Sequence, residues 1–374
     1  MKTFDAMSPE RLEELMAGFS AARIAVLGDF FLDKYLEIDR ELAERSVETG
    51  KIAHQVVGIR HSPGAAGTVV SNLAALGAGE LEAIGLTGDD GESWELRHDL
   101  NALGCRTNLL HRVAERWTPT YLKPRDRRDP SLAGEHSRYD TKNRTPTPAA
   151  VERKIIESLQ TVLPGVDAVI ALDQVHEEDC GVVTAAVRAA LARAAAEHPR
   201  IVFWADSRER IRRFRRLTVK ANQFEIAGNR HLHRLDAGPG DDSDQRVAIE
   251  ELCSAVRAMK SEVEAPVFAT LGAAGMIVSD PELSLVPGVR VEGPTDPTGA
   301  GDSATAGAVL ALAAGASCAE AALVGNLVAS ITVEQLATTG TASRTQLPPR
   351  LSMWLGQRAA AARDTSSGLD GRLL

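Results

Sequence analysis

The chain has 374 residues, of which 44% are hydrophobic and 25% charged, so it has the composition of a soluble protein with one large domain or two small ones. Its net charge of −9 argues against nucleic acid as the main partner, because the molecule has no overall positive field. The four cysteines lie far apart without a Cys-x-x-Cys pair, which excludes a disulfide scaffold or zinc-site pattern and fits a reducing cytoplasm.

The first 22 residues are predicted to form an amphipathic helix ahead of the main domain. Ser8 and Pro9 supply its N-cap and first turn, and no uncharged apolar run of signal-peptide length is present. We therefore expect a cytoplasmic protein and not a secreted one. The long stretch 303–333 carries one charge, Glu320, and is rich in Ala and Gly, which favours two buried helices over a membrane span.

Apolar strands and helices alternate along the chain. The strand-like runs that close on or just before a carboxylate are Arg23–Gly28, Asp167–Asp173 and Ile201–Asp206, and helical patterns lie at about 149–163, 178–197 and 243–260. This alternation predicts an α/β fold with a doubly wound, mainly parallel sheet flanked by helices. Because ligands gather at the carboxyl ends of parallel strands, we expect the carboxylates to face one cleft.

Two regions, about 34–63 and 106–124, have β-like patterns without a following helix. We predict from them a small projecting β-sheet, or lid, that closes over a substrate and excludes water. Ordinary edge strands of the main sheet are the alternative, and the pattern favours neither. The main domain is placed at 23–350, with loops at 125–148 and 238–244, and a C-terminal tail at 351–374.

The stretch 294–307 reads PTDPTGAGDSATAG and stands before an alanine-rich helix. The backbone N–H groups of Gly299, Ala300 and Gly301 can converge on an anion there, with no large side chain in the way. Asp302 follows in the first helical turn, where its carboxylate could take a proton from a hydroxyl that attacks a phosphoryl group. A plain helix cap behind a glycine turn is the alternative for a lone Gly-x-Gly-Asp.

Other motifs are weaker alone. In KANQFE, Asn222 and Glu225 offer oxygens to a hydrated Mg²⁺ or a phosphate, although an N-cap with its N3 glutamate explains the same spacing. TLGAAG at 270–275 indicates a hairpin, and SPGAAGTVVSNLAALG at 62–77 a glycine turn before a helix. The chain has neither a Gly-x-Gly-x-x-Gly after its first strand nor a Walker-type motif. The basic run 208–216 indicates a solvated helix face, with attraction of a phosphorylated substrate as the alternative.

Together these motifs make the chain, from about 23 to 347, similar to the ribokinase-like (PfkB) carbohydrate kinases. In the order and spacing of its motifs it resembles the kinase part of the bacterial heptose-7-phosphate kinase/ADP-heptose synthase group. The residues that carry the resemblance are Gly28-Asp29 with Asp33, the Gly64 turn, Arg138 and Asp140, Lys220-x-Asn222-x-x-Glu225, Thr270-x-Gly272-x-x-Gly275 and the signature at 296–302.

The resemblance implies a kinase that transfers a phosphoryl group from ATP, with Mg²⁺, to a hydroxyl of a sugar or sugar phosphate. Asp302 would be the catalytic base, and the amides at 299–301 would stabilise charge on the phosphoryl group. The residues implied for the substrate are Asp33, Gly64, Thr68, Arg138 and Asp140, and those for the nucleotide are Asn222, Glu225, Thr270, Gly272, Gly275 and Asn326. Asn222 and Glu225 would also serve Mg²⁺ through water, and a monovalent cation such as K⁺ is suggested near Asp296 and Thr298.

The sequence departs from the family pattern in three places. Thr68 stands where the family has a sugar-binding asparagine, Asp173-Gln-Val-His-Glu replaces Asp-Tyr-x-Lys-Gly of the heptose group, and no His-x-Gly-His nucleotidylyltransferase domain follows. A kinase for a nucleoside or another small alcohol therefore stays open, as does a non-catalytic nucleotide- or sugar-binding protein on the same scaffold. We also expect a homodimer joined partly through the projecting strands, because an exposed β-layer needs cover.

Overall fold

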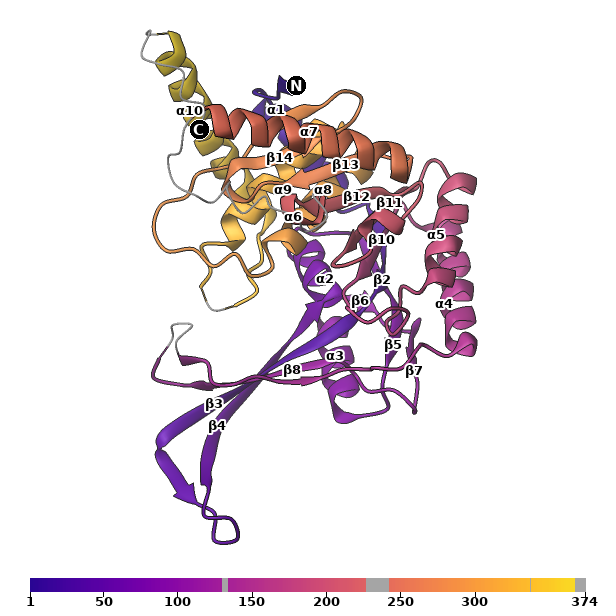
Figure 1. Ribbon diagram of the computed structural model, residues 1–374, viewed down its shortest axis with the longest axis vertical. Coiled ribbons are helices and arrows are strands. Elements are labelled where there is room, and N and C mark those ends of the chain that lie inside the picture. Colours follow the sequence, from indigo (N-terminus) through magenta and orange to yellow (C-terminus); the bar gives the residue numbers. More distant parts are fainter. Residues whose placement is uncertain (130–133, 227–241, 337, 367–374) are drawn as a thin grey trace.

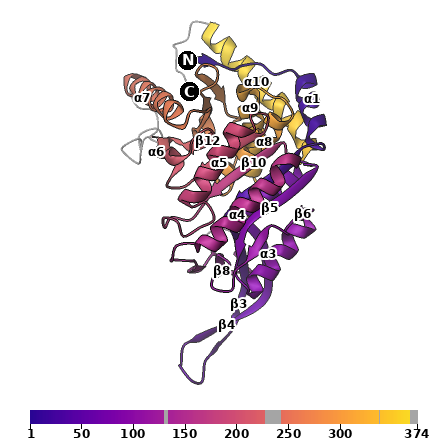
Figure 2. The ribbon, with the colours of Figure 1, turned by 90° about the vertical axis from the view of Figure 1, so that its right-hand side faces the viewer.

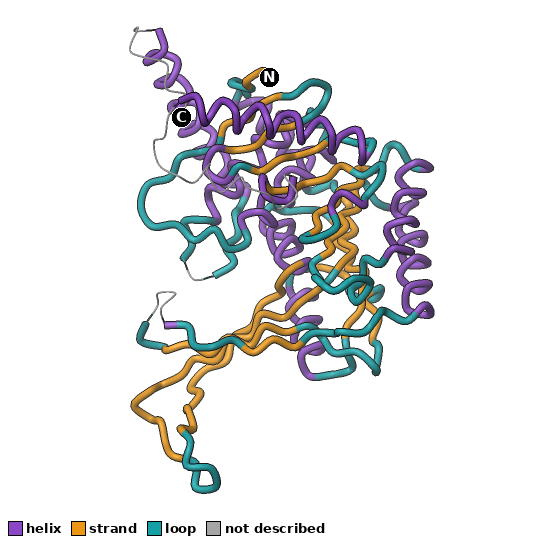
Figure 3. The backbone as a smooth tube through the Cα atoms, viewed as in Figure 1, coloured by secondary structure: helices purple, strands orange, loops and turns teal. Residues whose placement is uncertain are grey.

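The computed structural model describes residues 1–129, 134–226, 242–336 and 338–366. Two sheets organise these residues: an 11-stranded sheet between two layers of helices, and a separate four-stranded sheet that projects from it (Figure 1). The predicted class, an α/β fold with a mainly parallel sheet and a projecting β-sheet, is confirmed. Figure 3 shows the strands of the large sheet enclosed by helices and the projecting sheet open on its outer side.

The large sheet is parallel through its centre. From one edge to the other its strands are β1 (Lys2–Thr3), β15 (Ser284–Pro287), β14 (Gly275–Val278), β13 (Val267–Thr270), β12 (Thr218–Asn222), β11 (Val202–Ser207), β10 (Ala168–Asp173), β2 (Arg23–Gly28), β5 (Glu80–Thr87) and β6 (Cys105–Arg106), with β7 (Leu110–Arg112) also paired to β5. Strand β14 is antiparallel to both of its neighbours. The central strands are continuous apolar runs, so both faces of the sheet need helices.

Successive residues of β10 point into two different cores, Val169 into one and Ile170 into the other. The core around Ile170 is closed by α1 (Pro9–Phe19), α2 (Ala66–Ala75), α3 (Gly91–Ala102), α8 (Ala300–Ala313), α9 (Cys318–Thr332) and α10 (Leu347–Ser366). The core around Val169 is closed by α4 (Ala149–Val162), α5 (Ala185–Glu197), the short α6 (Gln223–Ile226) and α7 (Asp242–Val263). In Figure 2, α4 and α5 lie in front of the sheet, and α6 and α7 lie to its left.

The projecting sheet, which we call the lid, has the strand order β4-β3-β8-β9. Its strands are β3 (Phe30–Arg45), β4 (Ile52–Ala65), β8 (Thr120–Asp126) and β9 (Tyr139–Thr141). The expected strands within 34–63 are confirmed as β3 and β4. The segment 106–112 was wrongly expected in the lid, because β6 and β7 pair with β5 of the large sheet. Strand β9, in turn, lies inside a segment that was expected to be a loop.

Both ends of the described chain pack on the main body. The N-cap Ser8 accepts a hydrogen bond from the backbone of Arg11, as the sequence indicated, and α1 buries Leu12 in the core around Ile170. The chain from 351 was expected to be a tail. Instead α10 runs through it with Trp354 fully buried and its indole N–H donating to a backbone carbonyl, because apolar residues at helical spacing continue past 350. The expected loop at 238–244 lies mostly outside the described residues, and α7 begins at Asp242.

Candidate active site

The site is built around the start of α8. Gly299, the residue before this helix, has a left-handed backbone with φ of +78°. A β-carbon on Gly299 would lie 3.3 Å from Cγ2 of Thr339 and 3.5 Å from Cγ2 of Thr68, so conformation and space both favour glycine. Thr68, buried in the first turn of α2, therefore borders the predicted anion hole.

The N–H groups at this helix start are not equivalent. Ala300 donates to the carbonyl of Pro297 at 3.1 Å and so closes a turn. Gly301 donates to no acceptor among the described residues, and it has no side chain to cover its N–H. The positive end of α8 adds to the attraction of an anion at this point.

Asp302 lies half-buried in the first turn of α8, and its carboxylate has no hydrogen-bond partner in the described part of the chain. Burial, with the nearby carboxylate of Asp206, raises the pKa of Asp302 to about 7. Lys220 and Arg208 act in the opposite direction, and Asp33 of the lid adds a smaller rise. A carboxyl group that titrates near neutral pH is suited to accept and return a proton.

Below this helix start lies a buried ion pair that the sequence analysis did not identify. Lys220 of β12 and Asp206 of β11 are register partners, and their Nζ and Oδ2 atoms are 2.7 Å apart. A β-carbon on Gly301 would lie 3.2 Å from the Lys220 Nζ, so the ammonium group sits directly beside the N-terminus of α8. Burial favours the neutral amine, but Asp206, followed by Glu225 and Asp302, outweighs it and raises the pKa of Lys220.

Asn222 and Glu225 hold each other in place. Asn222 Oδ1 accepts from the backbone N–H groups of Phe224 and Glu225, and Glu225 Oε2 accepts from the N–H of Asn222 at 2.7 Å. The cap explanation for Asn-x-x-Glu is thus realised in the geometry. Burial and Asp206 raise the pKa of Glu225 to about 7.

These side chains fit a hydrated cation better than a directly bound one. In the residues that the structure describes, no three His, Cys, Asp or Glu side chains form a metal-ligating cluster. The carboxylates of Glu225, Asp206 and Asp302 nevertheless supply oxygen acceptors of the kind that the waters of Mg²⁺ favour.

The residues expected to border the nucleotide lie around the β13–β14 hairpin. Thr270 ends β13, and a short turn at Gly272–Ala274 leads to Gly275, whose φ is +104°. A β-carbon on Gly275 would lie 2.2 Å from the carbonyl oxygen of Val286, so this glycine is a requirement of the hairpin. Asn326 on α9 donates to the same carbonyl at 3.0 Å.

The pair suggested for a monovalent cation forms a local turn. Asp296 Oδ1 accepts from the N–H of Thr298 at 2.9 Å, and Asp296 is buried. The turn fixes the chain directly before Gly299, the N-cap of α8. Its part in binding a cation stays a prediction.

Four of the five residues expected to bind the substrate lie on one face of the lid, whereas Thr68 lies on α2. Asp33 pairs in register with Ser62 and with Tyr121, and Tyr121 pairs with Asp140, so these residues form one row across four strands. A β-carbon on Gly64 would lie 2.8 Å from Oδ2 of Asp33, which explains the glycine. Because side chains alternate along a strand, this face is the one opposite α3.

The same face carries two cations. Lys123 Nζ lies 2.9 Å from Asp33 Oδ1 and 3.4 Å from the hydroxyl of Tyr35. Burial works against the charge, but Asp33 and Tyr35 outweigh it, and the pKa of Lys123 is raised. Arg138 lies over the Tyr121 ring at 4.1 Å and is held by Asp140 at 2.7 and 2.9 Å.

Two of the strand-end carboxylates do not face this cleft. Asp29 accepts N–H bonds from Gln174, Val175 and Val182 in the interior, and burial followed by Asp173 raises its pKa to about 6. Asp173 forms a buried two-pronged ion pair with Arg210. The expectation that all the carboxylates converge was therefore wrong for this pair, which fixes the chain after β10.

Residues 30–345 match the pfkB family of carbohydrate kinases. The chain belongs to this family. The bifunctional protein HldE of Caulobacter vibrioides is 30% identical over 338 residues, which are 88% of this chain and 63% of that relative. The chain thus spans less than two thirds of this relative's length.

Solved structures of the ribokinase fold match most of the chain. Phosphofructokinase-2 from Escherichia coli in complex with potassium has 17% identity and a TM-score of 0.62, with 90% of this chain and 99% of that chain covered. Ribokinase from Cryptococcus neoformans in complex with ADP has 19% identity and a TM-score of 0.57, with 90% and 99% covered. The predicted ribokinase-like fold is confirmed, and the family makes the chain a carbohydrate kinase.

The helices within the described ranges include none whose length and apolar character would carry it across a membrane. The stretch 303–333, in which Glu320 is the single charged residue, lies in α8 and α9, which pack in the core around Ile170.

Proposed function

We propose that this pfkB kinase transfers the γ-phosphoryl group of ATP to a hydroxyl of a sugar phosphate, in the manner of a heptose-phosphate kinase. One observation carries the proposal: the carboxylate of Asp302 stands at the start of α8, beside Lys220 and within the field of Asp33 on the lid. The proposed base, Asp302, thus lies between the proposed anion site at the start of α8 and the lid face proposed to bind the substrate.

In the proposed step, Asp302 takes the proton of the substrate hydroxyl as its oxygen attacks the γ-phosphorus. The new O–P bond forms while the bond to the β-phosphate oxygen breaks, and ADP leaves. The Gly301 N–H, the Gly299 turn and the ammonium of Lys220 stabilise charge on the transferred group. A monovalent cation near Asp296 would support the same helix start.

Mg²⁺, when bound with ATP, neutralises charge on the phosphates. We assign its waters to Glu225, whose neighbour Asn222 holds the carboxylate in position. Glu225→Gln keeps an acceptor for the Asn222 N–H, and it is expected to raise the Mg²⁺ concentration for half-maximal activity by about tenfold. Glu209→Gln, at an exposed carboxylate paired with His176, serves as the control. An unchanged Mg²⁺ titration in Glu225→Gln would remove this role.

The lid face indicates an anionic substrate. Lys123 and Arg138 bring two positive charges to the row that contains Asp33, and guanidinium and ammonium groups are the usual partners of phosphate. Lys123 is paired with Asp33 and Arg138 with Asp140, and a substrate phosphate would give both cations a further anionic partner, which a neutral nucleoside lacks. A sugar phosphate, as in a heptose-phosphate kinase, is therefore favoured as the substrate over a nucleoside or another small alcohol.

Lys123→Met is expected to raise KM for a phosphorylated sugar by about tenfold or more, and to raise KM for the unphosphorylated sugar much less. Lys34→Met is the matched control, because Lys34 lies on the opposite face of the lid and pairs with Glu95 of α3. Arg138→Gln removes the second positive charge of this face, at an exposed position, and tests it by the same comparison of KM values. Equal effects on both sugars would contradict phosphate recognition by this face.

The function is tested by an ADP-release screen over sugars, their phosphates and nucleosides. Release with a sugar phosphate supports the proposal. ATP binding without ADP release in the presence of any of these compounds would support a non-catalytic binding protein instead. The observation that favours this alternative is Thr68, which replaces the family asparagine and lies beside the anion hole. A kinase that uses ATP is expected in the cytoplasm, and we propose that location for this protein.

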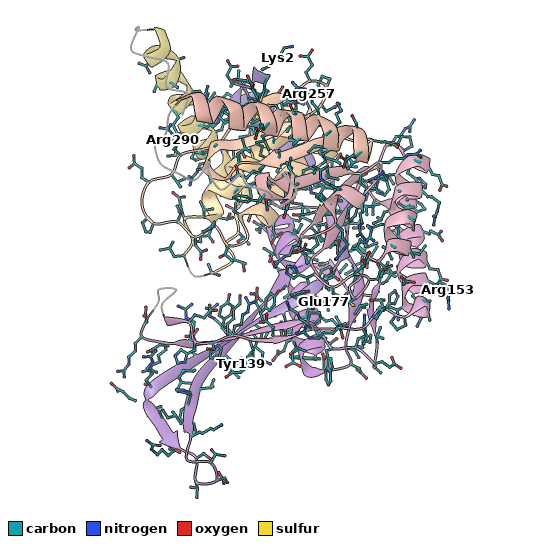
Figure 4. The ribbon with its side chains drawn as sticks, in the orientation of Figure 1. Lys2, Tyr139, Arg153, Glu177, Arg257 and Arg290 are labelled. Atoms are coloured by element: carbon teal, nitrogen blue, oxygen red, sulfur yellow. The ribbon has the colours of Figure 1, made fainter. Side chains whose placement is uncertain are left out.

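We also propose a homodimer through the lid. Large apolar side chains are exposed on its long hairpin, Val47 at 96%, Ile52 at 60% and Ile59 at 61%. Tyr139, labelled part-way along the lid in Figure 4, is 65% exposed. Light scattering is expected to show a dimer at micromolar concentration for the parent protein. The double variant Ile52→Lys/Ile59→Lys is expected to be a monomer. Leu336→Lys, an exposed position outside the lid, should leave the dimer intact. A monomeric parent protein would refute the proposal.

A further inference from the structure

A second groove lies away from the site described above, between α3 and the segment 107–112 that contains β7. Its volume is about 540 Å³, within the range of roughly 300–1,000 Å³ that small-molecule sites occupy. The side chains that matter for its chemistry are Trp94, Arg97, His98, Asn108, His111 and Arg112. None of the residues assigned to the kinase reaction lines it.

An aromatic platform forms one side of the groove. The rings of Trp94 and His98 stack with centroids 5.2 Å apart and planes at 13°. Trp94 is nevertheless 62% exposed, although large aromatic residues are usually well covered. The stacked histidine fixes the orientation of the indole, so its exposed surface is ready to receive a flat ring.

Positive charge lies beside this platform. Arg97 is held by the hydroxyls of Ser93 and Thr87 and the carbonyls of Thr107 and Leu110, so its guanidinium is fixed. Arg112 is exposed and has no ion-pair partner among the described residues. No carboxylate lines the groove, so these two cations give it a net attraction for an anion.

We propose that this groove binds a nucleoside monophosphate, with the base stacked on Trp94 and the phosphate held by Arg112. Stacking on an aromatic side chain suits any base, because every base has a flat π-face, and a guanidinium–phosphate bond orients the other end. This binding goes beyond the proposed kinase reaction and does not depend on it.

Helix α3 also connects the groove with the lid. Its residues Glu95 and Asp99 contact the lid strands through Lys34 at 2.9 Å and His61 at 2.6 Å. The groove and the lid contacts therefore lie on two faces of one helix, seen at the base of the lid in Figure 1. A ligand in the groove is expected to change the apparent KM for the sugar substrate by about fivefold or more, through the positions of these lid strands.

The binding test uses the full chain, saturated with a non-hydrolysable ATP analogue and Mg²⁺, in a Trp117→Phe background. Trp94 is then the one exposed tryptophan in the described residues, since Trp204 and Trp354 are buried. Titration with AMP is expected to quench Trp94 fluorescence with one site per chain. Adenosine, which lacks the phosphate, and inorganic phosphate, which lacks the ring, should each bind at least tenfold more weakly.

Arg112→Gln is expected to weaken AMP binding at least tenfold and to remove its effect on KM. Arg153→Gln, at an exposed arginine on the outer side of α4 (Figure 4), is the control and should change neither. Trp94→Leu, followed by calorimetry, checks the stacking independently. No AMP binding at the groove, or binding that survives both substitutions, would overturn the site. Binding without any change in KM would overturn its link to the lid.

Discussion

Replacing Asp302 with asparagine is expected to lower turnover by about 10²-fold or more while leaving ATP binding near that of the parent protein. Asparagine keeps the shape of the side chain but cannot accept the hydroxyl proton. Single-turnover kinetics and nucleotide titration separate the two effects. Retained turnover in the variant would contradict the role of Asp302 as base.

The raised pKa of Asp302 adds a pH test. Since the base acts in its ionised form, kcat/KM of the parent is expected to fall as the pH drops below about 7, and the residual activity of Asp302→Asn should lack this limb.

Stability should show the opposite dependence. A carboxyl group whose pKa is raised on folding binds its proton more tightly in the folded state, so its ionisation lowers the free energy of unfolding as pH rises from about 4 to 7. Asp302→Asn is therefore expected to raise Tm of the ligand-free protein at pH 8 and to change it little near pH 4. A lower Tm at pH 8 would contradict the buried-charge argument.

Replacing Lys220 with methionine is expected to cost both stability and activity. The substitution leaves Asp206, which is 7% exposed, without its buried partner, a loss that typically amounts to about 3–5 kcal/mol. It also removes the ammonium group from the proposed position of the transferred phosphoryl group, so kcat is expected to fall by about 10²–10³-fold. Denaturant unfolding and steady-state kinetics measure the two losses.

The double variant Asp206→Asn/Lys220→Met separates these effects. Without the uncompensated carboxylate, most of the lost stability is expected to return, whereas turnover should stay low. Lys154→Met, at an exposed lysine of α4, controls for the loss of a positive charge. Recovery of turnover together with stability would show that Lys220 only supports the fold.

The sequence predicted the parts of the site that lie close together in the chain. The glycine turn, Asp302 and the helix of α8 form one continuous segment, so their arrangement follows from local rules of turns and helix starts. The hairpin after Thr270 and the cap formed by Asn222 and Glu225 are local for the same reason, and the spacing of their residues was sufficient to predict them.

Contacts between strands could not be predicted in this way. Lys220 meets Asp206, 14 positions earlier, only because β11 and β12 pair in one register, and Lys123 meets Asp33 because β8 lies parallel to β3. A shift of one residue would point either partner to the other face. The same uncertainty explains why β6 and β7 were expected in the lid: a short β-pattern does not say which sheet it joins.

The two sheets give the molecule a division of labour that bears on how its preference can change. Asp206 and Lys220 are buried register partners on β11 and β12, in the middle of the large sheet. Asp33, Tyr121 and Lys123 lie on strands of the separate, smaller sheet, and Arg138 directly precedes its strand β9. In the proposed kinase, the preference for an acceptor can therefore change through substitutions in the small sheet, without any change to the strands that carry Asp206 and Lys220.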